Sequence, residues 1–281
     1  MTAIVIGLVP ALFWGILPIW IRKYTGGDFR NQLLGTTIGI VIVAGLLTLI
    51  LHLAFTWKTA MLFFLSGFCW SFGQAGQYYG YEHLGVSLTM PLSTALQIVG
   101  NSLIGGLVFG EWHGSHAIWL SLLMLVIIIV GVALTNGKLK GVVGRPKDYL
   151  ILVATTAGYW GYSALPHYAH VASNLTGFLP QALGMLIAGL LISSTQPKVF
   201  GQIATARNIT AGLIFSVAAA TYLVSLSLNG TVNAFVLSQL NVVVATLFGG
   251  LVLHEFVKGQ VWLTLFGLII LIGGATGLVM I

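Results

Sequence analysis

The chain has 281 residues, of which 58% are hydrophobic and only 6% are charged. Soluble globular proteins carry about 25% charged residues, so this composition excludes a soluble enzyme and places the chain in a lipid bilayer. The formal net charge of +6 does not indicate nucleic-acid binding, because the basic residues sort by loop, as described below.

Windows of about 20 apolar residues predict ten transmembrane helices and an all-α integral membrane protein. The predicted spans are residues 3–21, 33–55, 60–78, 84–110, 117–134, 149–165, 174–192, 209–226, 232–253 and 261–280. The connections between them leave no room for a soluble catalytic domain. The N-terminal apolar run lacks a basic region before it and a cleavage site after it, so we expect a retained first span.

The basic residues divide unequally between the two sides of the membrane. One side holds Arg22, Lys23, Arg30, Lys138, Lys140, Arg145, Lys147, Lys198, Arg207 and Lys258. The other side holds only Lys58. The positive-inside rule makes the first side cytoplasmic. We therefore expect a multi-pass protein of the cytoplasmic membrane with both termini outside.

The first predicted span contains a proline on each side of Trp14, and the fourth contains Pro91. A proline inside a helix removes a backbone donor, and interrupted helices at membrane depth are tolerated where they line a cavity. Trp14 has an equivalent, Trp160, in the second half of the chain. The two indole rings are candidates for stacking on a sugar ring, with packing in the helix bundle as the alternative.

Two stripes of uncharged polar side chains run through the third and fourth spans. Gln74 and Gln77 are three residues apart, and Ser93, Gln97 and Asn101 follow at intervals of four, so each stripe lies on one helix face. An unpaired amide in an apolar medium costs roughly 2 to 7 kcal/mol, so these side chains need partners. The partner is another helix, water or a substrate. Gln77 also lies close enough to the predicted cytoplasmic end to be solvated there.

An internal repeat relates the two halves of the chain. Residues 96–111 align without gaps with residues 240–255, and Phe-Trp-Gly at 13–15 matches Tyr-Trp-Gly at 159–161. The unit is five spans long, and five is odd, so the second copy enters the membrane from the opposite side. Such inverted repeats are typical of secondary transporters. We expect repeats at residues 1–135 and 149–281, joined by a cytoplasmic linker at residues 136–148.

The repeat pairs Thr94 with Ser238 and Gln97 with Asn241. Polar residues at symmetric positions of facing helices are candidates for a central cavity at the repeat interface. Interhelical hydrogen bonds, worth about 0.6 kcal/mol on average in membrane proteins, are the alternative. The predicted substrate site comprises Trp14, Gln74, Gln77, Thr94, Gln97, Asn101, Trp160, Ser238 and Asn241.

The charged residues narrow the substrate class. All five acids, Asp28, Glu82, Glu111, Asp148 and Glu255, fall at predicted helix ends or in loops. Cation–proton exchange needs a carboxylate at membrane depth, and binding of an anion needs a buried Arg or Lys. Amides and hydroxyls suit a neutral polyol instead. We expect Glu111 and Glu255 to cap the helices that follow them, and the histidines form no metal-binding or catalytic pattern, so we expect no cofactor.

Several motifs resemble the bacterial glucose/ribose porter family of the drug/metabolite transporter superfamily. They are Gly-Gln-Ala-Gly-Gln at 73–77, Leu-Gly-Val-Ser at 84–87, Met-Pro-Leu-Ser-Thr at 90–94, Gly-Glu-Trp at 110–112, Leu-Ser-Gln-Leu at 237–240, Val-Pro-Ala-Leu-Phe-Trp-Gly at 9–15 and Asn-Gln-Leu-Leu-Gly-Thr-Thr at 31–37. The resemblance covers the whole chain. It implies a ten-helix transporter that imports glucose or ribose with a proton. One departure is His254-Glu255-Phe256, where Gly-Glu followed by a polar or basic residue is expected.

The sequence therefore predicts a transporter of a neutral monosaccharide that works by alternating access. An exporter of amino acids or other small metabolites on the same fold is the first alternative. An intramembrane enzyme is the second, and it would require a paired acid, base or nucleophile at membrane depth, which the sequence does not offer. Coupling to protons stays open, since Glu111 and Glu255 would have to act from the membrane edge.

Overall fold

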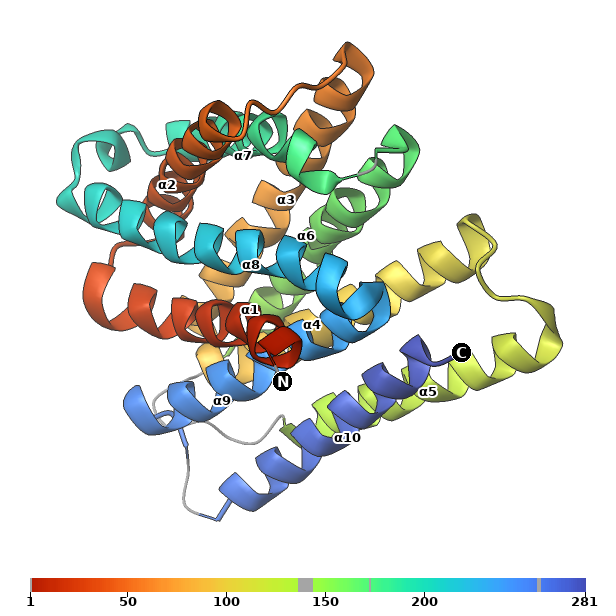
Figure 1. Cartoon of the computed structure of the whole chain (residues 1–281). Coiled ribbons are helices and arrows are strands. Elements are labelled where there is room, and N and C mark those ends of the chain that lie inside the picture. The colour runs from red at the N-terminus through yellow and green to blue at the C-terminus, as the bar shows by residue number, and fades with distance from the viewer. Residues whose placement is uncertain (1, 136–143, 172, 257–258) are drawn as a thin grey trace.

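The protein is described by a computed structural model that covers residues 2–135, 144–171, 173–256 and 259–281. Lys138, Lys140, Lys258 and most of the predicted linker lie outside these described residues. Within them the fold is entirely helical (Figure 1). The helices are α1 (Thr2–Trp20), α2 (Phe29–Ile50), α3 (Trp57–His83), α4 (Val86–Leu103), α5 (Gly114–Thr135), α6 (Pro146–Ala164), α7 (Phe178–Ser194), α8 (Ile203–Gln239), α9 (Asn241–Val252) and α10 (Val261–Val279).

Short helical turns extend several of these elements. Single π-helical turns follow α1 at Ile21–Thr25 and α4 at Ile104–Val108. Turns of 3-10 helix lie at Leu165–Ala169, Asn174–Gly177 and Pro197–Gly201.

The starts of the helices follow from local sequence. Asp28 caps α2 by accepting from the backbone N–H groups of Arg30 and Asn31, and the Asn31 side chain returns a bond to the Asp28 N–H. The Thr56 hydroxyl caps α3 through the Thr59 N–H. The break between α3 and α4 falls at Gly85, whose φ of +79° favours glycine.

Seven helical segments are long and apolar enough to cross a membrane. They are the segments of α1, α2, α4, α5, α7, α8 and α10, and only described residues enter this comparison. The other three helices are α3, α6 and α9. We attribute the lower hydropathy of α3 and α6 to the polar side chains described below, while α9 has only 12 residues. The chain is a multi-pass membrane protein, as the composition predicts.

The predicted boundary between the eighth and ninth spans is wrong. The sequence places it between residues 226 and 232, but α8 continues as one 37-residue helix to Gln239, and the turn falls at Leu240. The position that aligns with Gly85 is Asn229, whose amide donates to the Ser225 hydroxyl one turn earlier, at 3.0 Å, and to the Ala3 carbonyl, at 2.8 Å. Without a glycine in the left-handed region there, the helix continues.

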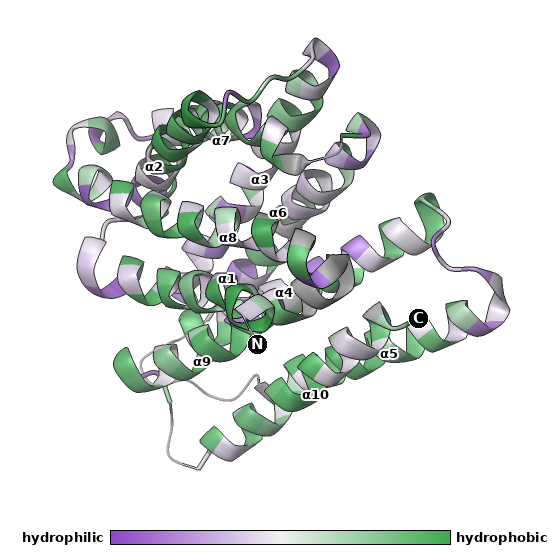
Figure 2. Ribbon diagram, viewed as in Figure 1, coloured by the Kyte–Doolittle hydropathy of each residue, from purple (hydrophilic) through white to green (hydrophobic). Residues whose placement is uncertain are grey.

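The helices pack into a bundle with one pair set apart. α3 packs between α6 and α7, α8 packs on α1 and α2, and α5 and α10 form an antiparallel pair along one edge (Figure 1). A Cβ atom at Gly67 would overlap the Gln181 backbone, so the absence of a side chain lets α3 and α7 touch. Apolar side chains cover much of the outer surface, whereas α3 and α6 are paler, which marks lower hydropathy (Figure 2).

Candidate functional site

A network of buried amides and hydroxyls joins α3, α4 and α6. The Gln74 Nε2 group donates to Gln77 Oε1 at 3.2 Å, and Gln77 Nε2 donates to Ser93 Oγ at 3.2 Å. Gln97 Nε2 donates to the same Ser93 Oγ at 3.2 Å. Gln74 and Gln77 are only 5% and 7% exposed, so Gln77 is not solvated at the helix end. The two predicted stripes thus meet between α3 and α4.

Tyr159 on α6 completes this network, and sequence reasoning missed it. Its hydroxyl donates to Gln74 Oε1 at 2.8 Å and to Gln77 Oε1 at 2.9 Å. Its ring lies against Gly73, where a Cβ atom would stand 2.7 Å from the ring. The Tyr-Trp-Gly motif at 159–161 was the available signal, but it directed attention to the neighbouring tryptophan.

The direction of these hydrogen bonds determines which donor and acceptor groups remain for a ligand. Because Tyr159 donates, the carbonyl oxygens of Gln74 and Gln77 face α6 and their amide nitrogens donate onward. The Gln97 amide nitrogen donates to Ser93, and no hydrogen bond to the Gln97 carbonyl oxygen occurs among the described residues. Gln97 is half-buried. Its carbonyl oxygen is therefore an acceptor available to a hydroxyl group.

Trp160 is committed to packing in this conformation. Its Nε1 donates to the Leu96 carbonyl at 3.0 Å, and its indole lies on Gly100, where a Cβ atom would overlap the ring. This contact holds α6 against α4 next to Ser93. Trp160 thus packs against α4 in this conformation, the role that the sequence left as an alternative.

α1 and α9 carry three buried polar atoms without a hydrogen-bond partner among the described residues, and one of them is the Thr246 hydroxyl. Trp14 packs against Phe215 and Tyr222, with ring centroids 5.9 and 5.8 Å apart. Its Nε1 and the Oδ1 of Asn241 are buried, and neither has a hydrogen-bond partner in the part of the chain that the structure describes. α1 approaches α9 closely, because a Cβ atom at Gly15 would lie 3.0 Å from the Asn241 carbonyl oxygen. The Trp14 N–H donor and the Asn241 carbonyl acceptor are therefore both unfilled.

Thr94 and Asn101 form no hydrogen bond with this network among the described residues. Thr94 and Ser238 are buried, at 5% and 2% exposed, and Asn101 is half-buried. The structure thus brings together Gln74, Gln77 and Gln97 and leaves the rest on the helices around them.

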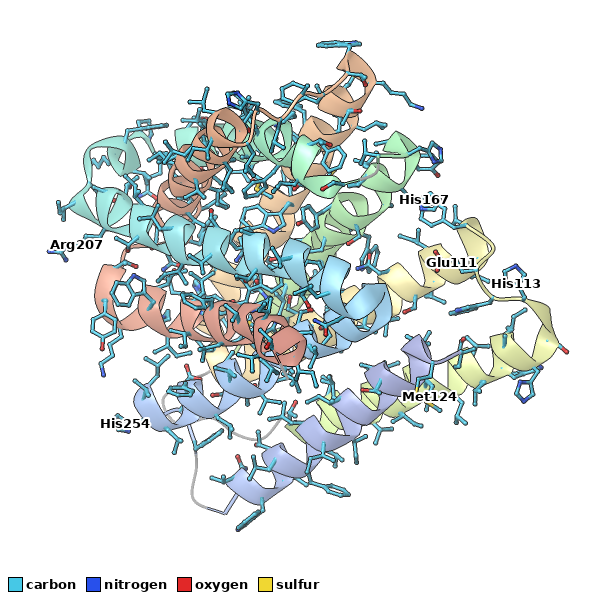
Figure 3. All side chains as sticks on the ribbon, viewed as in Figure 1. Glu111, His113, Met124, His167, Arg207 and His254 are labelled. Carbon is cyan, nitrogen blue, oxygen red and sulfur yellow. The ribbon has the colours of Figure 1, made fainter. Side chains whose placement is uncertain are left out.

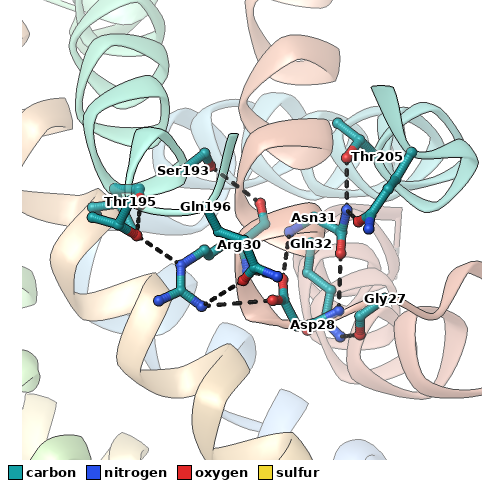
Figure 4. A network of polar contacts seen from close by, with 11 residues as sticks. Gly27, Asp28, Arg30, Asn31, Gln32, Ser193, Thr195, Gln196 and Thr205 are labelled. Carbon is teal, nitrogen blue, oxygen red and sulfur yellow. Dashed lines mark hydrogen bonds and ion pairs between the residues drawn. The ribbon is translucent and has the colours of Figure 1, made fainter. Parts of the chain in front are cut away.

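A second polar network, not predicted from the sequence, ties α2 to α7 and α8 (Figure 4). Asn31 is 2% exposed, and its Nδ2 donates to Gln202 Oε1 at 2.7 Å and to Thr205 Oγ1 at 2.9 Å. Arg30 donates to Thr195 Oγ1 at 2.9 Å and forms an ion pair with Asp28 at 3.5 Å. These bonds fix the ends of three helices on the side predicted to be cytoplasmic.

The carboxylates of Asp148 and Glu255 both accept hydrogen bonds from backbone N–H groups at helix starts. Asp148 accepts from the Arg145 N–H at 2.9 Å and from the Tyr79 hydroxyl at 2.8 Å. Burial opposes ionisation of this carboxyl, but these two bonds outweigh it and lower its pKa. The expectation that Glu255 caps the following helix is wrong: its carboxylate caps α4 instead, through the N–H groups of Val86 and Ser87.

Glu111 also departs from the expectation. Its side chain is exposed and caps no helix among the described residues. Its backbone N–H donates to the Gly105 carbonyl at 3.0 Å, which closes the turn after α4.

Two cavities lie away from the amide network. One of about 420 Å³ is lined by Gly27, Asp28, Asn31, Gln196, Gln202, Ile203 and Ala204. The other, of about 280 Å³, is lined by Glu82, His83, Arg145, Lys147 and Asp148. Neither of these two cavities includes a predicted substrate-site residue.

Comparison with known proteins gives consistent matches over nearly the whole chain. The sequence model of a family described as sugar transport protein matches residues 5–281. A protein of Lactobacillus helveticus named for sugar uptake is 40% identical over 277 residues, covering 97% of this chain and 98% of the relative. A Bacillus subtilis (strain 168) protein named for glucose uptake is 37% identical, covering 97% and 96%.

A third relative, from Latilactobacillus sakei subsp. sakei (strain 23K), is named for ribose uptake. It is 39% identical over 263 residues, covering 90% of this chain and 89% of its own. A solved crystal structure is similar with a TM-score of 0.62 at 18% identity, and it covers 98% of this chain and 96% of that one. The structural similarity concerns the fold alone.

Proposed function

Because the chain belongs to the sugar transport protein family, we propose that it is a secondary transporter that imports a neutral monosaccharide, glucose or ribose, across the cytoplasmic membrane. Relatives named for glucose and for ribose uptake support both sugars. Import proceeds by alternating access around a site between the two five-helix repeats, residues 1–135 and 149–281, with both termini outside.

The uncharged character of the buried network is the observation that carries the choice of substrate. Its hydrogen bonds join only amides, hydroxyls and a thioether, since Gln77 Nε2 also contacts Met90 Sδ at 3.5 Å. A sugar hydroxyl both donates and accepts, so it can pair with such groups without burying a charge. A charged substrate would need a counter-ion at the same depth.

The unfilled groups support an assignment of the residues that contact the sugar. The Trp14 N–H donates to a sugar oxygen, and the carbonyl oxygens of Asn241 and Gln97 accept from sugar hydroxyls. Gln74 and Gln77, held by Tyr159, position the amide of Gln97 through Ser93. Trp160, Thr94, Ser238 and Asn101 complete the proposed lining.

Uptake into proteoliposomes tests the proposal. Purified protein is expected to take up labelled glucose or ribose and to exchange it in counterflow, whereas labelled amino acids give no signal. Accumulation only under an imposed pH gradient would establish proton symport, and simple equilibration would establish a facilitator. Counterflow of amino acids without sugars would favour the exporter and contradict the proposal.

Substitutions of proposed site residues, compared with a control substitution outside the site, test which residues bind the sugar. We expect Gln97→Ala and Asn241→Ala to raise the uptake KM for the transported sugar about tenfold, which corresponds to the loss of one hydrogen bond to the substrate. Gln260→Ala is the control, since this amide precedes α10 and lies outside the network. An unchanged KM and rate in both site variants would show that the proposed site is wrong.

A further inference from the structure

A buried carboxylate closes one end of the α4–α9 pair. Glu255 follows α9 and is 8% exposed. Its Oε1 accepts from the Val86 N–H at 2.9 Å, and its Oε2 accepts from the Ser87 N–H at 2.7 Å. These are two of the N–H groups that the first turn of a helix leaves unpaired, at the positive end of the helix dipole. Both oxygens therefore form strong, charge-assisted bonds.

The surrounding residues are shaped to fit this contact. The Ser87 hydroxyl donates to the Thr246 carbonyl on α9 at 3.1 Å. A Cβ atom at Gly249 would lie 2.7 Å from Ser87 Oγ and 3.1 Å from Glu255 Oε2, so the absence of a side chain keeps the space open. Gly85, with φ of +79°, turns the chain into α4 directly beneath the carboxylate. The end of α9 and the start of α4 are thus joined by three hydrogen bonds.

The equivalent carboxylate at the other end forms no such contact. The sequence repeat pairs Glu255 with Glu111, which is exposed, and no hydrogen bond or ion pair of its side chain occurs among the residues that the structure describes. The repeat pairs Val86 and Ser87 with residues 230 and 231, which lie inside the continuous helix α8. Glu111 and His254, the neighbour of Glu255, lie at opposite ends of the bundle (Figure 3).

We propose that Glu255 is a latch that holds the cytoplasmic ends of α4 and α9 together, and that this latch opens when the sugar is released into the cell. The proposal rests on the transport function proposed above. In the conformation described here the Glu255 latch is closed, and Glu111 forms no equivalent contact with the described residues. Since α4 carries Gln97 and α9 carries Asn241, separation of these two helices exposes the site to the cytoplasm.

Labelling of a buried reporter cysteine tests the latch directly. Thr246 is 0% exposed, and its hydroxyl has no hydrogen-bond partner among the described residues. It lies three residues before Gly249 on α9, so the two residues share a helix face. In a Cys69→Ala background, Thr246→Cys is exposed to a membrane-impermeant maleimide in inside-out vesicles. Glu255→Gln, which keeps the shape but loses the charge and one acceptor oxygen, is expected to raise the labelling rate about tenfold.

Two control variants, Glu111→Gln and Gly273→Ala, and a second latch variant, Gly249→Ala, keep the test specific. Glu111→Gln removes the equivalent charge at the other end and is expected to give a labelling rate no higher than the parent. Gly249→Ala, whose new methyl group presses on the latch, is expected to raise the rate, whereas Gly273→Ala, which adds a methyl group in open space, is not. An unchanged rate in Glu255→Gln, or an equal rise in Glu111→Gln, overturns the proposal.

The assay separates the latch from the transport proposal. It contains no sugar, so an absent latch effect leaves the uptake result untouched, and absent uptake leaves the labelling result valid. Each variant is first checked for a single symmetric peak in gel filtration, and its labelling rate is compared with that of the same protein after denaturation. A rate equal to the denatured value in Glu255→Gln would indicate unfolding, and Gly249→Ala then decides the question.

Discussion

Replacing Tyr159 with phenylalanine removes one oxygen atom from the amide network and leaves the ring on Gly73. The Gln74 carbonyl loses its donor, while the Gln77 carbonyl still accepts from Gln74 at 3.2 Å. One buried acceptor is therefore left without a partner, which costs about 1 to 3 kcal/mol, whereas an average interhelical bond in a membrane contributes only about 0.6 kcal/mol. We therefore expect Tyr159→Phe to lower the free energy of unfolding by about 1 to 3 kcal/mol.

The same change is expected to weaken sugar binding. Without the Tyr159 donor, the amides of Gln74 and Gln77 are free to turn over, and the chain of bonds through Ser93 no longer fixes the direction of the Gln97 amide. We expect the uptake KM to rise about tenfold, equivalent to roughly 1.4 kcal/mol of binding free energy. Thermal unfolding of the purified protein in detergent and initial rates of labelled sugar uptake measure the two effects.

Tyr162→Phe is the matched control for this substitution. Tyr162 lies three residues later on α6 and is half-buried, and its hydroxyl forms no hydrogen bond with the described residues. It should change neither Tm nor KM. The reasoning is refuted if Tyr159→Phe keeps the wild-type Tm and KM, or if both variants change by the same amount.

Three other substitutions have definite expected outcomes. Gly100→Ala places a methyl group on the Trp160 indole and should lower Tm by several degrees, whereas Gly45→Ala, in open space, should not. His254→Gly should raise stability by about 0.5 to 1 kcal/mol in denaturant unfolding, because His254 has φ of +56° and the left-handed cost exceeds the extra chain entropy of glycine. Asp148→Asn should be less stable than the wild type at pH 7. The pKa of Asp148 is lowered in the folded protein from its ordinary value of 3.8. The stability difference between the variant and the wild type should therefore be constant at pH values above 3.8 and disappear as the pH falls below 3.8 through the folded pKa.

The helices and the amide stripes could be predicted because they depend on local sequence. Apolar windows located most spans within a few residues, and the spacing of Gln74, Gln77 and Gln97 correctly placed polar faces that needed partners. The partner of the first two was not predictable. Tyr159 reaches them only because Gly73 lets α6 approach α3 closely, and that distance depends on tertiary packing.

The role of Glu255 was misjudged for a similar reason. A carboxylate before a helix is ordinarily a cap for that helix, and nothing local indicates that Val86 and Ser87, about 170 residues earlier in the chain, offer better donors. The same applies to His254, which stands where the family resemblance predicts glycine. The structure shows why glycine suits that position, since both His254 and its repeat equivalent Gly110 have positive φ.

The continuity of α8 through residues 229–231 explains both its length and the exposure of Glu111. A helix of 37 residues is about 55 Å long, whereas the hydrocarbon core is about 30 Å thick, so α8 fits within it only at a tilt beyond the usual limit of about 40°. Asn229 and Gly230 have the weakest helix propensity in the stretch where the sequence predicts a break. A break there would free backbone N–H groups at residues 230 and 231, which the repeat places opposite Glu111. By the sequence alignment of the two halves, the continuous helix withholds the donors that Glu111 would need, and among the described residues only the Glu255 end of the α4–α9 pair is capped by a carboxylate.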